Sequence, residues 1–273
     1  MISDSLERSN AQSSLPGESG FLDKKIGPFA CFGSVCCSAD RPPILAAMES
    51  GRWGSSPAPI PPKARVKPRL RGVSHRYAFL TALLPCLLLV RSAPTGWAAW
   101  ASAIYAGSLL ALLGTSALYH EVHWSPRARF WLVRVDLAMI FALIAGTYTP
   151  IAMLKLEPQL GKLVLAGVWG AALFGAVLKT VWIDPPKWAS AAVYVGVGSV
   201  ALIFLPQVVA AIGNTATMLM GLGGALYIAG AIVYGLQRPD PLPDVFGYHE
   251  IFHAFVVAAA TVHFVTLALY VVR

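Results

Sequence analysis

Long apolar runs, separated by short polar connections, fill the chain from residue 75 to the C-terminus. An α-helix needs about 20 apolar residues to cross the hydrocarbon core of a bilayer, and in lipid it satisfies all of its own backbone groups. Of the 34 Lys, Arg, Asp and Glu residues, only 17 lie among the 197 positions after Arg76, which is too few for a soluble domain of that size. We therefore expect an all-α integral membrane bundle of seven transmembrane helices, at 75–92, 97–119, 131–153, 162–182, 189–209, 215–236 and 247–271.

The basic residues between the expected spans predict the orientation of the bundle. Cytoplasmic connections carry an excess of Lys and Arg over those on the outer side. If the N-terminus is cytoplasmic, four basic residues fall outside, and these are Arg91, Lys155, Lys162 and Arg273. Twelve fall inside, namely Lys63, Arg65, Lys67, Arg69, Arg71, Arg76, Arg127, Arg129, Arg134, Lys179, Lys187 and Arg238. This bias predicts a multi-pass protein with its N-terminus in the cytoplasm and its C-terminus outside, in the plasma membrane if the source is a bacterium.

The first 66 residues differ in composition from the rest of the chain. They are rich in Ser, Gly and Pro and contain no long apolar run, so we expect a disordered N-terminal arm at 1–66 and a membrane domain at 67–273. A true start at Met48 would explain the same segment equally well. The basic cluster at 63–76 adjoins the first span, so we expect it to contact anionic lipid headgroups rather than nucleic acid.

Four ionisable side chains lie at span ends that share one depth in this topology. Such a group costs about 2.5–3.5 kcal/mol at the centre of a membrane helix, so each one calls for a partner or a function. His120 ends the second span, Asp136 begins the third, and His249 and His253 begin the seventh. All four are expected near the cytoplasmic face. Ser116 lies one helical turn before His120 and faces the same way.

The spacing of these histidines is compatible with a metal site. His249 and His253 are at i and i+4, so their imidazoles lie on one helix face, about 6 Å apart. Three imidazoles and a water molecule form the open tetrahedral zinc site of hydrolytic enzymes, and Asp136 could hold or deprotonate that water. The alternative is that each histidine is an ordinary hydrogen-bonding residue at the membrane boundary. His263 lies about 15 Å deeper than His253, so we expect it to make an interior hydrogen bond instead.

Six short motifs occur in order along the membrane domain. They are Lys67-Pro68-Arg69-Leu70-Arg71-Gly72, Ser116-x-x-x-His120, Arg134-Val135-Asp136, Ile144-Ala145-Gly146-Thr147-Tyr148-Thr149-Pro150, His249-x-x-x-His253-x-Phe255 and Val262-His263-Phe264. In these motifs the chain resembles the hemolysin III family, within the wider progestin and adipoQ receptor group of seven-span proteins. The resemblance covers about residues 65–273. Bacterial members commonly carry His after the Asp of the third span, where this chain has Leu137, so any role of that His is missing here.

The resemblance implies a function as well as a fold. It implies a zinc ion held by His120, His249 and His253, with Asp136 in contact with a water ligand of the zinc. It also implies that Ser116 lies close enough to stabilise a developing oxyanion. Related receptors and alkaline ceramidases look like metal-dependent amide hydrolases that act on lipids, so a membrane lipid is the implied substrate. The hemolysin label itself implies membrane lysis by a cytolytic or pore protein.

Two further functions fit the same residues. His249-Glu250-Ile251-Phe252-His253 satisfies the HExxH pattern, in which the Glu is the general base of a zinc protease, so an intramembrane metalloprotease is a remote alternative. Zinc could instead be a structural pin in a non-enzymatic receptor or membrane-homeostasis protein. Replacing Glu250 by Gln separates the first alternative, because a protease would lose all activity and a hydrolase with Asp136 as its base would not.

Overall fold

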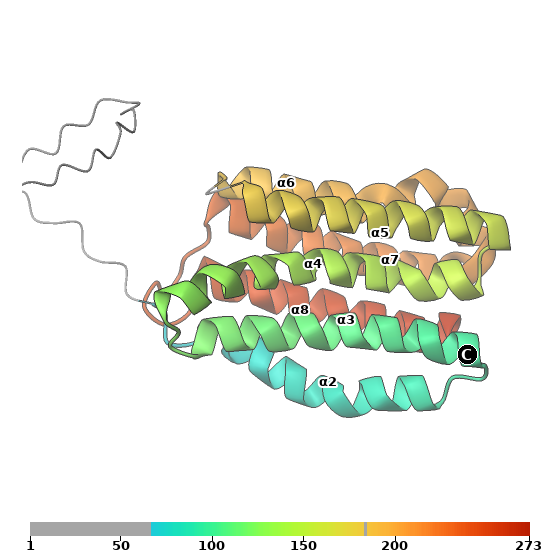
Figure 1. Cartoon of the computed structure of the whole chain (residues 1–273), viewed down its shortest axis with the longest axis horizontal. Coiled ribbons are helices and arrows are strands. Elements are labelled where there is room, and N and C mark those ends of the chain that lie inside the picture. Colours follow the sequence, from blue (N-terminus) through green and yellow to red (C-terminus); the bar gives the residue numbers. More distant parts are fainter. Residues whose placement is uncertain (1–66, 183–184) are drawn as a thin grey trace, which may run out of the picture. The chain divides into compact units, whose positions relative to one another are not determined.

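The computed structural model describes residues 67–182 and 185–273 of the chain. The expected N-terminal arm, 1–66, lies outside the described residues. The regular structure of the described part is helical apart from one isolated bridge between Leu242 and Phe246. Its helices (Figure 1) are α2 (Val73–Arg91), α3 (Gly96–Glu121), α4 (Pro126–Leu154), α5 (Pro158–Val181), α6 (Lys187–Gly198), the 3₁₀ helix η1 (Ser199–Phe204), α7 (Leu205–Leu236), α8 (Tyr248–Thr266) and the π-helical turn η2 (Leu267–Val271).

The start of α4 is fixed by a local signal that the hydropathy pattern does not carry. The Ser125 hydroxyl accepts a hydrogen bond from the Ala128 N–H at 3.3 Å, and Pro126 occupies the first helical position, where a missing N–H has no consequence. The helix therefore begins before residue 131, where the third span was expected to begin. Asp136 consequently lies ten residues into α4 rather than at its start.

Six segments of the described chain are long and apolar enough to cross a membrane. Five of them coincide with α2, α3, α4, α5 and the continuous stretch of α8 and η2. The sixth, Lys187–Leu236, is 50 residues long and contains both of the runs expected at 189–209 and 215–236. By length and composition the structure therefore gives six candidate membrane segments, where the sequence predicts seven.

The 50-residue segment is bent back on itself. A straight helix of this length would measure about 75 Å, far more than the hydrocarbon core of about 30 Å. Gly213 interrupts the helix with φ 80° and ψ 166°, a conformation that glycine adopts readily. Near the end of α7, a Cβ atom at Gly235 would lie 3.4 Å from the Cα of Trp188, near the start of α6. The end of α7 thus packs beside the start of α6, and the two helices run antiparallel (Figure 1).

Large apolar side chains cover the outside of the helices. Trp97, Phe174 and Met218 are 72%, 68% and 74% exposed, which in water would leave extensive apolar surface uncovered and in lipid is favourable. Between α4 and α5, in contrast, the Phe141 ring is fully buried and packs against Gly175, which has no side chain to hold it off. The described chain is therefore a multi-pass integral membrane protein whose core lies between helices.

Candidate functional site

Three helix termini meet at one end of the bundle (Figure 1). The helix α3 ends there, whereas α4 and α8 begin there. His120 lies in the last turn of α3, and His249 and His253 lie in the first two turns of α8. His120 and His249 are 129 positions apart in the sequence. They still lie at the same end of the bundle, because successive helices run in alternating directions.

The three imidazoles converge on one point. Each offers a ring nitrogen, and these nitrogens all lie within 4.8 Å of one another. The Nε2 atoms of His120 and His249 are 3.3 Å apart, and the ring centroids of His249 and His253 are 4.5 Å apart. His253 is buried, and its Nδ1 has no hydrogen-bond partner among the described residues. Because an unsatisfied buried polar atom costs about 1–3 kcal/mol, this cluster is suited to holding a metal ion.

Asp136 and Ser116 lie beside the histidines. One carboxylate oxygen of Asp136, Oδ2, is 3.8 Å from the Nε2 of His120, and the Ser116 hydroxyl lies near the same carboxylate. The Asp136 side chain is 15% exposed and Ser116 is buried. The structure thus brings together the five residues that the sequence singled out, from α3, α4 and α8, and their chemical roles stay predictions.

A fourth imidazole and an ion pair adjoin the cluster, and neither was among the candidate site residues. His75, in the first turn of α2, is buried and stacks on His253, with ring centroids 3.9 Å apart and planes within 4° of parallel. Arg71, just before α2, forms an ion pair with the buried carboxylate of Glu250. The basic motif before the first span was the available signal for Arg71, but its partner lies 179 positions away.

Glu250 is fully engaged at the start of α8. Besides the ion pair with Arg71, its carboxylate accepts a hydrogen bond from the Gly247 N–H at 2.8 Å and so caps the helix. A general base must be within hydrogen-bonding reach of the proton it removes and free to accept it. The HExxH pattern is therefore explained by helix capping, and the geometry gives no support to the protease alternative.

A cavity of about 460 Å³ extends from the cluster into the bundle. Ser116, Asp136, His249 and His253 contribute to its lining at the end where the histidines meet. Residues from 249 to 263 of α8 follow it over about 20 Å, at 1.5 Å per residue.

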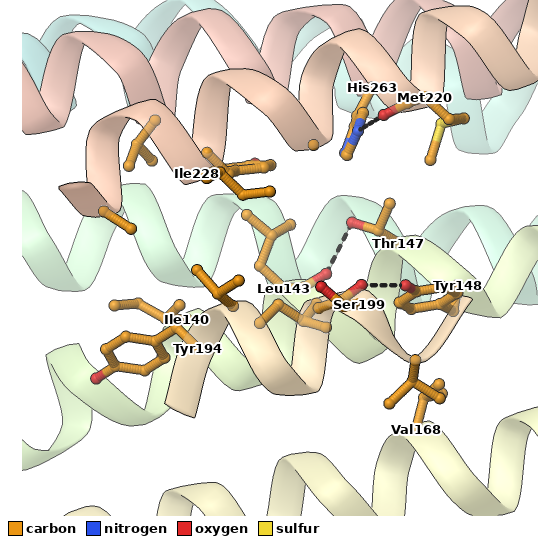
Figure 2. Close-up of a pocket in the computed structure, with 18 of the residues that line it drawn as sticks. Ile140, Leu143, Thr147, Tyr148, Val168, Tyr194, Ser199, Met220, Ile228 and His263 are labelled. Atoms are coloured by element: carbon orange, nitrogen blue, oxygen red, sulfur yellow. Dashed lines mark hydrogen bonds between the residues drawn. The ribbon is translucent and has the colours of Figure 1, made fainter. Parts of the chain in front are cut away.

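The deeper part of the cavity is mostly apolar. Ile140, Leu143 and Val168 are among its lining residues in Figure 2. His263 also lies there, and its Nε2 pairs with the backbone carbonyl of Met220 at 3.0 Å. This interior hydrogen bond confirms the role expected for His263, well away from the other histidines. The shape and lining suit a hydrocarbon chain.

Comparison with known proteins decides the family. The family described as Haemolysin-III related matches residues 63–264, which include every helix from α2 to most of α8. The chain belongs to the hemolysin III family. All five site residues lie within the matched range, and the resemblance expected from the six motifs is confirmed.

Curated relatives of this hemolysin III protein come from bacteria and animals. The Hemolysin-3 homolog of Bacillus subtilis (strain 168) is 29% identical over 204 residues, which cover 74% of this chain and 92% of the relative. Hemolysin-3 of Bacillus cereus is 28% identical over 202 residues, covering 73% and 89%. The monocyte to macrophage differentiation factor of Homo sapiens is 25% identical over 206 residues, covering 73% and 82%. Each match spans most of the relative and leaves about a quarter of this chain uncovered.

Proposed function

We propose that this hemolysin III protein is a zinc-dependent membrane hydrolase that cleaves a lipid amide or ester, in the manner of a ceramidase. One observation carries the proposal. A cluster of three imidazoles, beside a serine–aspartate pair, forms one end of an apolar cavity long enough for an acyl chain. The scissile carbonyl of a lipid would lie at the polar end of this cavity, with its hydrocarbon in the apolar part.

The donor set fits zinc. Neutral imidazole nitrogens are preferred zinc ligands, and three protein ligands with an open fourth position are typical of catalytic sites. His120, His249 and His253 would hold the ion. The buried Nδ1 of His253 has no hydrogen-bond partner among the described residues, which is consistent with a metal ligand. When bound, zinc would polarise a carbonyl oxygen and activate a water molecule as a nucleophile.

Asp136 and Ser116 have distinct roles in this proposal. The Asp136 carboxylate accepts the proton released by the attacking water and passes it to the leaving group. The Ser116 hydroxyl lies near that carboxylate, where it can orient it. Stabilisation of an oxyanion by Ser116 requires the hydroxyl to point at the substrate oxygen in the transition state.

The proposed membrane topology has seven crossings, with the N-terminus in the cytoplasm. The fold-back of Lys187–Leu236 at Gly213 supports two crossings for this segment. The charge bias supports the orientation, since the described basic residues expected inside, from Lys67 to Arg238, lie toward the helix ends that carry the histidines. In this topology the site faces the inner leaflet, and the basic residues ahead of α2 contact anionic lipid headgroups.

The decisive experiment combines metal analysis with turnover. Protein purified without chelators is expected to contain about one zinc per chain, and His249→Ala and His253→Ala are expected to lose it. Wild type is expected to hydrolyse ceramide-like amides, and Asp136→Asn to retain zinc while losing about 10²–10⁴-fold in rate. Asp244→Asn, which removes an exposed carboxylate, is the control and is expected to leave the rate unchanged.

Two results would contradict the proposal. Wild-type protein purified without metal would contradict the zinc site. A fully active Asp136→Asn variant would contradict the assignment of Asp136 as the general base. Bound zinc without turnover across a broad lipid panel would favour the non-enzymatic alternative, in which the metal pins α3 to α8.

A further inference from the structure

Residues 69–76, which we call the brace, connect the two helices that carry the three histidines. On the α8 side, the backbone N–H groups of Arg69 and Leu70 donate to the carbonyls of Asp244 and Val245 at 3.1 and 3.2 Å. The side chain of Arg71 then forms the ion pair with Glu250. Glu250 is buried and caps the helix turn that contains His249.

On the α3 side, the brace touches the last turn. Gly72 has φ 90°, and a Cβ atom there would lie 2.7 Å from the Cβ of His120, so the backbone packs directly against this histidine. The Arg76 guanidinium donates to the Glu121 carboxylate at 3.0 Å. Between the two sides, His75 stacks on His253. Four residues of the brace, namely Arg71, Gly72, His75 and Arg76, thus contact the helix turns that carry the three histidines.

We infer that the brace is a positioning element for the three-histidine cluster, and that the Arg71–Glu250 ion pair is the connection on which it depends. This inference rests on the proposed zinc site. The ion pair fixes the first turn of α8, the close contact at Gly72 fixes the last turn of α3, and the spacing of the imidazoles follows from both. Arg71 acts through Glu250 and has no role in the chemistry itself.

The sign of the effect separates positioning from electrostatics. Arg71 carries a positive charge near the cluster, so by Coulomb's law alone its removal would strengthen the binding of a divalent cation. If Arg71 positions the histidines, its removal weakens binding, because groups that orient metal ligands are typically worth about 10- to 100-fold in metal affinity. The two explanations therefore predict changes in opposite directions.

The test is a metal titration of the full-length protein in detergent. Arg71→Ala is expected to bind Zn²⁺ about 10- to 100-fold more weakly than wild type and to alter the visible spectrum of bound Co²⁺. Arg71→Lys keeps the charge and one donor and is expected to recover most of the affinity. The control is Arg69→Ala, which also removes one positive charge, two positions earlier in the chain. The Arg69 side chain is exposed, and the hydrogen bond from its backbone N–H to Asp244 stays in place. Unchanged or tighter binding by Arg71→Ala would overturn the inference.

A second measurement does not depend on metal. In metal-free protein, Arg71→Ala is expected to speed hydrogen exchange of the amides at 247–253 by about tenfold or more, the effect of losing a charged hydrogen bond. Arg69→Ala is expected to leave these amides unchanged. If wild type binds no zinc, the proposed function fails, and exchange alone decides the brace. If wild type binds zinc but Arg71→Ala changes neither affinity nor exchange, the brace fails and the zinc site stands.

Discussion

The packing of Gly72 against His120 gives a quantitative prediction for Gly72→Ala. A non-glycine residue with positive φ costs about 1–2 kcal/mol. The new Cβ would lie 2.7 Å from the Cβ of His120, where carbon atoms prefer about 3.5–4.0 Å, so one of them must move by about 1 Å. Overpacking of this kind adds about 1–3 kcal/mol. The free energy of unfolding should therefore fall by about 2–5 kcal/mol.

The measurement is reversible unfolding in mixed detergent micelles, followed by tryptophan fluorescence, together with zinc content. Gly96→Ala is the matched control, because Gly96 is the first residue of α3 and a Cβ there meets nothing within 4 Å. This variant should be unchanged, or more stable by up to about 1 kcal/mol. Gly72→Ala should also bind zinc more weakly, since His120 is displaced. Equal stability and equal zinc content in the two variants would refute the packing argument.

Three further predictions concern the base, the cavity and the topology. Glu250→Gln should keep more than a tenth of the wild-type turnover, because Gln has nearly the same shape and its one side-chain oxygen keeps either the helix cap or the hydrogen bond from Arg71, and complete loss would restore the protease alternative. Gly224→Leu places four carbons in the cavity, where they displace about four methylenes of an acyl chain. Losing the burial of these methylenes costs about 3 kcal/mol of binding free energy, so kcat/KM for the longest substrates should fall by about 100-fold. Short-chain substrates, and the Gly170→Leu control on the exposed side of α5, should be unaffected, and an equal loss at all chain lengths would contradict the cavity assignment. In intact cells, single cysteines at Lys187 and Arg238 should both be protected from an impermeant thiol reagent, whereas one crossing by the segment between them would expose one of the two.

The convergence of the histidines could be predicted because membrane topology limits where each residue lies. A chain that crosses the bilayer repeatedly returns to the same face, so His120, Asp136 and His249 share a depth although they are far apart in sequence. The four-residue spacing of His249 and His253 then places both on one helix face. Depth and face together were enough to predict the cluster.

The contacts of the brace could not be predicted in the same way. The helix α2 is apolar on most sides, because lipid and neighbouring helices both favour apolar residues, so hydropathy does not show which face packs against α8. The stacking of His75 on His253 depends on that choice. The ion pair of Arg71 with Glu250 depends on it as well, and charge bias alone indicated a lipid contact for this arginine.

The number of membrane segments was ambiguous for a related reason. The helices on either side of Gly213 form one continuous helical stretch, so a count by length and composition gives one segment where the sequence predicts two. The early start of α4 was missed because Ser125 and Pro126 begin the helix in a polar stretch, ahead of the apolar run from which the span was predicted.

The proposed function requires three imidazoles, from helices far apart in the sequence, to hold one zinc ion. X-ray absorption at the zinc edge, on protein purified without chelators, measures this coordination. We expect one zinc per chain with three nitrogen ligands at about 2.0–2.1 Å and an oxygen ligand in addition, and fewer nitrogen ligands in His120→Ala. A sample without zinc, or a shell that keeps all its nitrogen ligands in His120→Ala, would contradict the claim.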